Sequence, residues 1–122
     1  MKLKALLASV VSALLLTACQ STSDKGLIPT ANQETIEEAR KVLSSNEEIK
    51  VDETGVISLV QELPNGMMWD RTVTKKVGRE LSCDNLRYFV EKGMIVSIHF
   101  KGRRGRFDQF DENRCLEEDQ YL

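Results

Sequence analysis

The apolar run at the N-terminus decides how much of this chain is left to fold and in which compartment it folds. Two lysines, Lys2 and Lys4, open the sequence, and only Ser9 and Ser12 interrupt the apolar residues at positions 5–16. A basic start followed by a run of this length is typical of a secretory signal peptide. As a helix, about twelve residues span about 18 Å, well short of the roughly 30 Å hydrocarbon core of a bilayer. We therefore expect residues 1–18 to direct export.

The residues that close this run, Leu16-Thr17-Ala18-Cys19, resemble the lipobox of bacterial lipoproteins. The resemblance implies cleavage before Cys19, a diacylglycerol group on its sulfur and an acylated amino group. Two or more acyl chains hold a protein stably on a membrane. In lipoproteins an aspartate after the cysteine favours the inner membrane, so Gln20 implies the periplasmic leaflet of the outer membrane. The alternative is an ordinary signal peptide with a chance cysteine.

Length and charge restrict the exported chain to one small domain of weakly acidic character. Removing 18 residues from 122 leaves 104, which is enough for a single core. The removed segment contains two of the 17 basic residues and none of the 19 acidic ones, so the net charge falls from −2 to −4. A net negative charge argues against bulk binding of nucleic acid. The lipid, rather than a basic patch, is then expected to hold the protein at the membrane.

Two cysteines, Cys83 and Cys115, remain after Cys19 is assigned to lipid. An even pair in a small exported domain predicts a disulfide rather than a metal site or a redox couple. The bond would close a loop of about 32 residues and stabilise the fold by roughly 3.5 to 4 kcal/mol in the chain-entropy model.

Composition and hydrophobic periodicity then divide the rest of the chain. Residues 20–32 are mostly polar, so we expect 19–32 to be a lipidated cysteine with a flexible tether and 33–122 to be the folded domain. Ile36, Ala39 and Leu43 recur at helical spacing, which predicts a first helix.

Residues 47–74 alternate with a period of two and contain the turn residues Thr54-Gly55 and Pro64-Asn65-Gly66. This pattern predicts an antiparallel meander whose third strand runs from Met67 to Val73. Residues 75–93 return to helical spacing, with Asp84 as a possible restart cap and Gly93 as terminator. Residues 94–110 predict a hairpin that turns at 102–105.

The order of these segments predicts the α+β class and a single small domain. We expect an antiparallel sheet of about five strands with two helices on one face, stapled by the Cys83–Cys115 disulfide. The bond would join the start of the second helix to the segment after the last strand.

The order cysteine, helix, glycine, strand, glycine turn, strand, cysteine in residues 82–115 resembles a group of small Gram-negative lipoproteins. Within this group, the α/β class of type II secretion pilotins has a known function. In that class a disulfide ties the helix to the end of the sheet, and the lipoprotein carries secretin subunits to the outer membrane by binding a short secretin segment. The resemblance covers about residues 55–115 and lies in cysteine, glycine and apolar positions, so it assigns no secretin-binding residue.

The sequence gives little support to catalysis, and we expect no enzyme, no metal and no cofactor. His99 is the only histidine, and it falls on the polar side of its strand with Ser97 and Lys101. A solvated histidine is the simpler interpretation than a general base. No carboxylate lies within an apolar run that would raise its pKa. The chain also has no phosphate loop, metalloprotease or serine-hydrolase motif.

Two features favour binding instead. Lys101, Arg103, Arg104 and Arg106 gather four positive charges on one hairpin, where they can dock lipid phosphates or an acidic partner segment. The second feature is a set of methionine and aromatic residues, whose side chains form adaptable grooves for a partner. These residues are Met67, Met68, Trp69, Tyr88 and Phe89.

For both features a structural role is the competing interpretation: a solvated turn for the arginines and core packing for the apolar residues. We predict a non-catalytic, membrane-anchored lipoprotein, pilotin-like, that binds an envelope protein segment through Arg103, Arg104, Arg106 and Trp69. The alternative is a periplasm-facing lipoprotein that binds a small ligand or inhibits an envelope enzyme.

The lipobox resemblance generates the first prediction, that the mature protein begins at acylated Cys19 and partitions with membranes. Mass spectrometry of the mature N-terminus measures this. A soluble product that begins at another residue would refute it.

Overall fold

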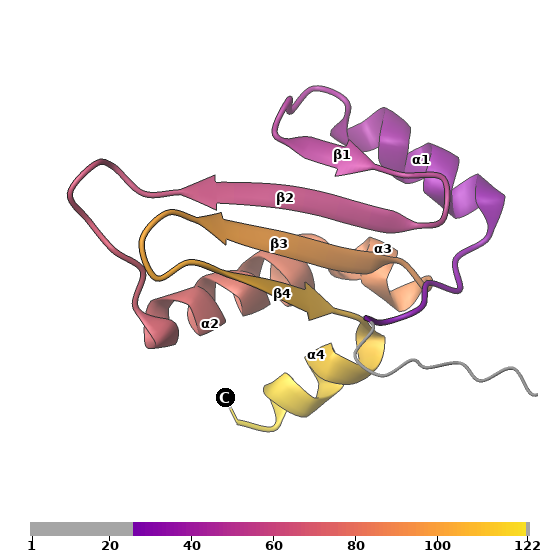
Figure 1. The fold of residues 1–122 in the computed structure, drawn as a ribbon. Helices are drawn as coiled ribbons and strands as arrows, with labels where there is room; N and C mark the ends of the chain where they lie inside the picture. Colours follow the sequence, from indigo (N-terminus) through magenta and orange to yellow (C-terminus); the bar gives the residue numbers. More distant parts are fainter. Residues whose placement is uncertain (1–25, 122) are drawn as a thin grey trace, which may run out of the picture.

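The computed structural model of this chain describes residues 26–121, which form one four-stranded sheet and the helices that pack on it (Figure 1). The signal segment and Cys19 lie outside the described residues. The strands are β1 (Ile49–Val51), β2 (Val56–Glu62), β3 (Ile95–Lys101) and β4 (Arg106–Phe110). The helices are α1 (Gln33–Leu43), α2 (Arg71–Arg79), the π-helix η1 (Glu80–Asn85), α3 (Arg87–Glu91) and α4 (Glu112–Asp119). The α+β class predicted from the sequence is confirmed.

The sheet is mixed, and its strand order is β1-β2-β3-β4. β1 pairs antiparallel with β2, and β3 pairs antiparallel with β4, as in two hairpins. β2 and β3 instead run parallel, from Val56 opposite Ile95 to Glu62 opposite Lys101. A parallel pair needs a long crossover, and here the crossover contains α2, η1 and α3. The prediction of about five strands, all antiparallel, with two helices was therefore wrong.

The core lies between one face of this sheet and the helices. Alternate residues of the strands contribute the sheet side of the core, since side chains alternate between the two faces. These residues are Ile57, Leu59, Val96, Ile98, Phe100 and Phe110. Ile36 and Ala39 of α1 and Phe89 and Val90 of α3 meet them from the helical side. Ser97 and His99 point to the other face and are half-buried, which agrees with the prediction that the two share one side of their strand.

The predicted third strand, Met67 to Val73, does not form. Only an isolated parallel bridge between Met68 and Arg103 remains of it, and α2 begins at Arg71. The Asp70 carboxylate caps this helix by accepting hydrogen bonds from the N–H groups of Thr72 and Val73. This N-cap decides the conformation, because it satisfies helix donors that a strand would have to pair elsewhere.

The helical run predicted over residues 75–93 is present but divided. α2 continues into a π-helix over Glu80–Asn85, and the chain restarts as α3 with Leu86 at the N-cap. Asp84 is therefore not the restart cap; its carboxylate accepts from Arg79 at 3.3 Å. Gly93 ends the run, as predicted, with a φ of +101° that favours glycine.

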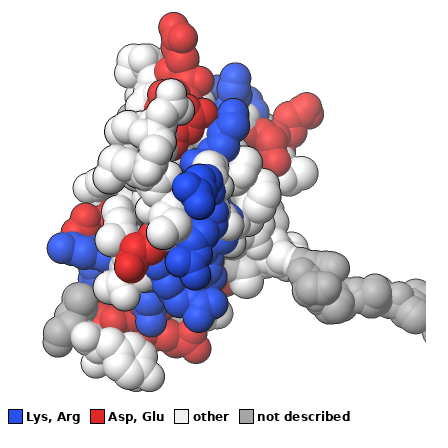
Figure 2. Space-filling view, turned by 60° about the vertical axis from the view of Figure 1, so that its left-hand side comes forward, with Lys and Arg blue, Asp and Glu red and all other residues white. Residues whose placement is uncertain are grey.

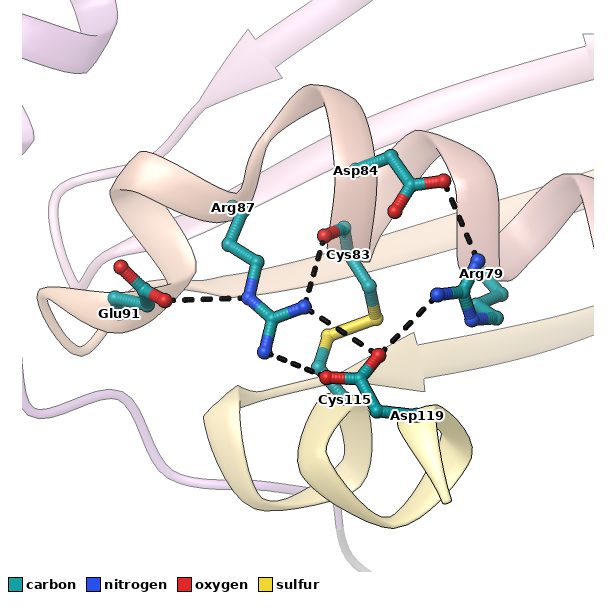
Figure 3. Close-up of polar contacts among 7 residues, drawn as sticks. All are labelled: Arg79, Cys83, Asp84, Arg87, Glu91, Cys115 and Asp119. Carbon is teal, nitrogen blue, oxygen red and sulfur yellow. Dashed lines mark hydrogen bonds and ion pairs between the residues drawn. A yellow bond between two sulfur atoms is a disulfide. The ribbon is translucent and has the colours of Figure 1, made fainter. Parts of the chain in front are cut away.

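The disulfide between Cys83 and Cys115 is present, with the two Cα atoms 5.5 Å apart. It joins the π-helix to α4, and both cysteines are fully buried. Asp119 of α4 lies beside the bond, and its carboxylate forms ion pairs with Arg87 at 2.9 Å and Arg79 at 3.2 Å (Figure 3). The hydrogen bond from Arg87 is the main reason that the pKa of Asp119 is lowered. The disulfide and these ion pairs together hold a C-terminal helix that buries one residue of its own, Cys115.

The described chain begins at one end of the sheet, and the β3–β4 turn lies at the other. Leu27 N–H donates to Gln109 Oε1 near the end of β4, and Thr30 N–H donates to Gly93 O just before β3. Seven-residue β3 separates this end from the turn, a distance of about 20 Å at about 3.3 Å per residue. No helix in residues 26–121 has the length and apolar character needed to cross a membrane.

The second prediction concerns the disulfide. Replacing both Cys83 and Cys115 with serine should lower the free energy of unfolding by about 3 to 4 kcal/mol, because the reduced chain regains the entropy of a loop that spans 32 positions. Urea denaturation of wild type and double variant measures the difference. A loss below about 1 kcal/mol would show that the ion pairs of Asp119 hold α4 without the bond.

Candidate functional site

Trp69 holds the β3–β4 turn against the start of the crossover. Its backbone N–H donates to Arg103 O at 2.9 Å, and its indole Nε1–H donates to Lys101 O at 3.0 Å. The ring packs edge-on against Phe100 with centroids 5.0 Å apart, and only 6% of the residue is exposed. The loop before α2 and the tip of the hairpin are therefore fixed to each other through one side chain.

The turn itself needs two unusual backbone positions. Arg104 has a φ of +59°, the left-handed region that a non-glycine residue seldom adopts. A Cβ at Gly105 would lie 2.0 Å from Phe100 O, so only glycine fits there. Because the turn is locked in this way, Arg103 and Arg104 are held in a fixed place at the end of the sheet.

An open cleft of about 940 Å³ lies beside this turn, between the hairpin and the first turn of α2. We call it the basic cleft. Its lining residues are Met68, Trp69, Asp70, Arg71, Thr72, Thr74, Arg104, Gly105, Arg106 and Phe107. The cleft therefore combines three guanidinium groups with hydroxyl groups and two exposed apolar side chains.

The cations of the basic cleft have no carboxylate partner within the described part of the chain. No salt bridge among residues 26–121 includes Arg71, Arg104 or Arg106. The one carboxylate in the lining, that of Asp70, already accepts the N–H groups that cap α2. Figure 2 shows Lys and Arg side chains gathered in a continuous band on this side of the molecule. Unpaired guanidinium groups are available for a carboxylate or phosphate ligand.

A smaller cleft continues the basic cleft along α2 and shares Arg71 and Arg106 with it. Here part of the charge is paired, because Arg114 binds Asp108 at 2.7 Å and approaches Glu118 at 3.7 Å. Lys75, which also lines this cleft, has no salt bridge to another described residue. Burial is the largest single influence on the pKa of Arg114 and lowers it. The hydrogen bond and charge of Asp108, together with those of Glu118, outweigh burial, so the pKa of Arg114 is raised. The uncompensated positive charge therefore extends from the hairpin along α2 to Lys75.

Phe107 is one of the residues that line the basic cleft, and its ring lies on the face of the sheet that carries His99. It is 68% exposed and stacks on His99 with ring centroids 4.0 Å apart. Met68, on the opposite side of the lining, is 50% exposed. A partner that buries an apolar side chain here removes apolar surface of both residues from water.

The structure places the residues predicted for partner binding in two different roles. Arg104 and Arg106 line the basic cleft, and Arg103 lies in the same turn and binds Trp69 through its carbonyl. Trp69 is a buried anchor for that turn, so its direct contact with a partner stays a prediction. Lys101, the fourth cation of the hairpin, pairs with Glu62 at 3.4 Å.

Sequence reasoning missed Arg71, Thr72 and Phe107 as part of this site. Arg71 and Thr72 were assigned to a strand, whereas the helix that starts after Asp70 turns them towards the hairpin. The signal that could have found them is Asp70 itself, an N-cap residue before a helical pattern of small buried positions, Thr74 and Gly78.

A metal centre has no basis in the part of the chain that the structure describes. No group of three His, Cys, Asp or Glu side chains among residues 26–121 lies close enough to hold a metal ion. In a comparison with protein-family models, curated proteins and solved structures, nothing matched this chain.

The third prediction concerns Trp69. Replacing Trp69 with phenylalanine should cost about 1 to 2 kcal/mol of stability and speed hydrogen exchange in residues 102–105, because Lys101 O loses its donor and the ring contact shrinks. Denaturation and exchange measured by NMR test both effects. Met68→Ala is the control, since Met68 is half exposed, and should change the exchange of the turn less. Equal exchange in wild type and Trp69→Phe would contradict the anchoring role.

Proposed function

We propose that this protein is a non-catalytic, lipid-anchored lipoprotein of the periplasmic leaflet of the outer membrane that binds a short acidic segment of an envelope protein in the basic cleft. A pilotin-like accessory role in outer-membrane secretion or assembly is the most concrete form of this proposal. The observation that carries it is the cluster of Arg71, Arg104 and Arg106 beside exposed Phe107, in which no arginine has a salt bridge to another described residue. This cluster occurs in a chain whose net charge is negative.

The chemistry of the basic cleft favours carboxylates next to an apolar side chain. Guanidinium groups bind carboxylates through two parallel hydrogen bonds, and three of them line the cleft, one from α2 and two from the hairpin. Met68 and Phe107 supply adaptable apolar contacts between these charges. Buried aromatic and apolar contacts give most of the affinity in such interfaces, while charges mainly set orientation and association rate.

The position of the basic cleft favours a protein partner over the membrane that carries the lipid. The described chain starts at the opposite end of the sheet from the cleft, about one β3 length away. Six residues lie between Cys19 and Gly26, so these two residues are at most about 25 Å apart along the extended chain. If Cys19 is lipidated, the cleft can face away from the bilayer and meet a segment in the periplasm.

The shape of the basic cleft favours a chain segment over an enclosed small molecule. It is open to solvent beside the turn, and its lining comes from two sides, the hairpin and α2. Small-molecule sites usually bury most of their ligand in a concave pocket, whereas peptides are bound in open grooves. This geometry is the reason to place the small-ligand function second.

The fourth prediction tests the proposed function with a single charge reversal. Arg104→Glu should weaken binding of the envelope partner about five- to tenfold at low salt, and the effect should shrink near 0.5 M salt because exposed charges are screened. The measurement is retention of envelope proteins by lipidated wild type and variant at two salt concentrations.

Lys41→Glu makes the same charge change on the exposed surface of α1 and is the matched control, expected to bind like wild type. Both variants should keep wild-type stability, since exposed charges contribute little. A partner that Arg104→Glu retains as well as wild type would exclude the basic cleft. A pilotin-like role further requires that secretin subunits fail to reach the outer membrane when the gene is deleted.

A further inference from the structure

Strand β2 extends beyond the strand that pairs with it on its outer side. β1 pairs only with residues 57–59 of β2, whereas β2 runs to Glu62. On its other side β2 pairs with β3 along its full length. Residues 60–62 therefore form an open edge in an otherwise paired strand.

The hydrogen-bonding direction along β2 identifies which backbone groups are open. Val56 O accepts from Asp52 N–H on the β1 side, and Gly55 O accepts from Ile95 N–H on the β3 side. Because this direction alternates along a strand, Val60 and Glu62 direct their N–H and C=O groups to the side that β1 leaves empty. Within the described residues, one side chain bonds to these backbone groups: Gln61 Nε2 donates to Val60 O at 3.3 Å. Two residues thus present backbone groups to a new strand.

An open groove of about 400 Å³ lies along this edge. Its lining residues are Glu47, Glu48, Lys50, Ser58, Val60, Gln61 and Glu62. Three carboxylates and one ammonium group make the groove acidic, the opposite of the basic cleft. Space, open backbone groups and negative charge therefore coincide at one place.

We propose that this groove binds an extended segment of another protein that carries Lys or Arg side chains and adds a strand to β2. Main-chain hydrogen bonds to Val60 and Glu62 would give the register, and the carboxylates of Glu47 and Glu48 would select the basic side chains. This site is separate from the basic cleft, and it depends neither on the lipid anchor nor on the pilotin-like role.

The alternative occupants fit the groove less well. Residues 26–30 lie at the opposite end of the sheet, near Gln109 and Gly93, so the start of the described residues is remote from Glu62. A second copy that paired edge to edge would bring the acidic rims of both copies together, and like charges opposite each other destabilise strand pairs. Charge complementarity therefore selects a basic segment.

The test uses a blocked synthetic peptide, Lys-Val-Lys-Val-Lys-Val-Lys, and the folded, oxidised protein without its lipid. At about 1 mM peptide, NMR should show shifts centred on the amides of Val60 and Glu62, with slower hydrogen exchange at both. The Glu-Val-Glu-Val-Glu-Val-Glu peptide should not shift these amides. A basic peptide methylated on alternate backbone nitrogens should bind at least about fivefold more weakly, since it lacks the donors for the edge.

Glu62→Pro removes the outward N–H without removing a bond to β3, and it should weaken the basic peptide about fivefold or more. Glu62→Ala is the matched control, because it loses the same charge and keeps the N–H, and it should bind more tightly than Glu62→Pro. Melting curves of both variants confirm that each is folded. Three results would overturn the proposal. They are absence of shifts at Val60 and Glu62, equal binding of the peptide by the two variants, and failure to bind the peptide in a protein that sediments as a dimer.

Discussion

The position of the candidate site depends on the two hydrogen bonds of Trp69. Its backbone N–H and its indole N–H both donate to carbonyls of the hairpin, at Arg103 and Lys101. These bonds fix the end of the loop that follows β2, so Asp70 and α2 begin beside the turn. This attachment sets where Arg71 lies relative to the hairpin, and the packing of Gly78 of α2 against Phe110 of β4 supports the same arrangement farther along the helix.

A second group of contacts fixes the far end of the crossover. The Cys83–Cys115 disulfide and the ion pairs of Asp119 with Arg79 and Arg87 hold α4 against the π-helix. α4 has little apolar surface in the core, so covalent and charge-assisted contacts replace the hydrophobic burial that a longer helix would use. With α4 in place, Arg114 pairs with Asp108 beside the hairpin and α2.

The two proposed binding surfaces carry opposite charges and lie on opposite sides of the β2–β3 pair. Arg71, Arg104 and Arg106 line one, and Glu47, Glu48 and Glu62 contribute to the other. Lys101 and Glu62 pair between them at 3.4 Å, where β2 and β3 end together. A protein of small net charge presents two such surfaces when its positive and negative side chains are separated in space.

The sequence alone determined the features that depend on local pattern or on residue counts. It predicted the helix around Ile36 and Ala39, the β3–β4 hairpin and the helix end at Gly93, because periodicity and turn glycines act over short range. It predicted the Cys83–Cys115 bond because two cysteines allow one pairing. It also identified Arg104 and Arg106 as exposed hairpin cations. The lipid on Cys19 remains a prediction from sequence.

Tertiary structure decided the features that depend on which segments meet. Residues 67–73 alternate like a strand, but the indole of Trp69 reaches Lys101 O, 32 positions away, and the Asp70 cap then starts a helix. That one change makes β2 and β3 parallel and brings Arg71 to the hairpin. The end of β2 is uncovered because β1 pairs only with residues 57–59. A local pattern cannot specify such contacts, because the free energy that selects them comes from burial and hydrogen bonds between residues distant in sequence.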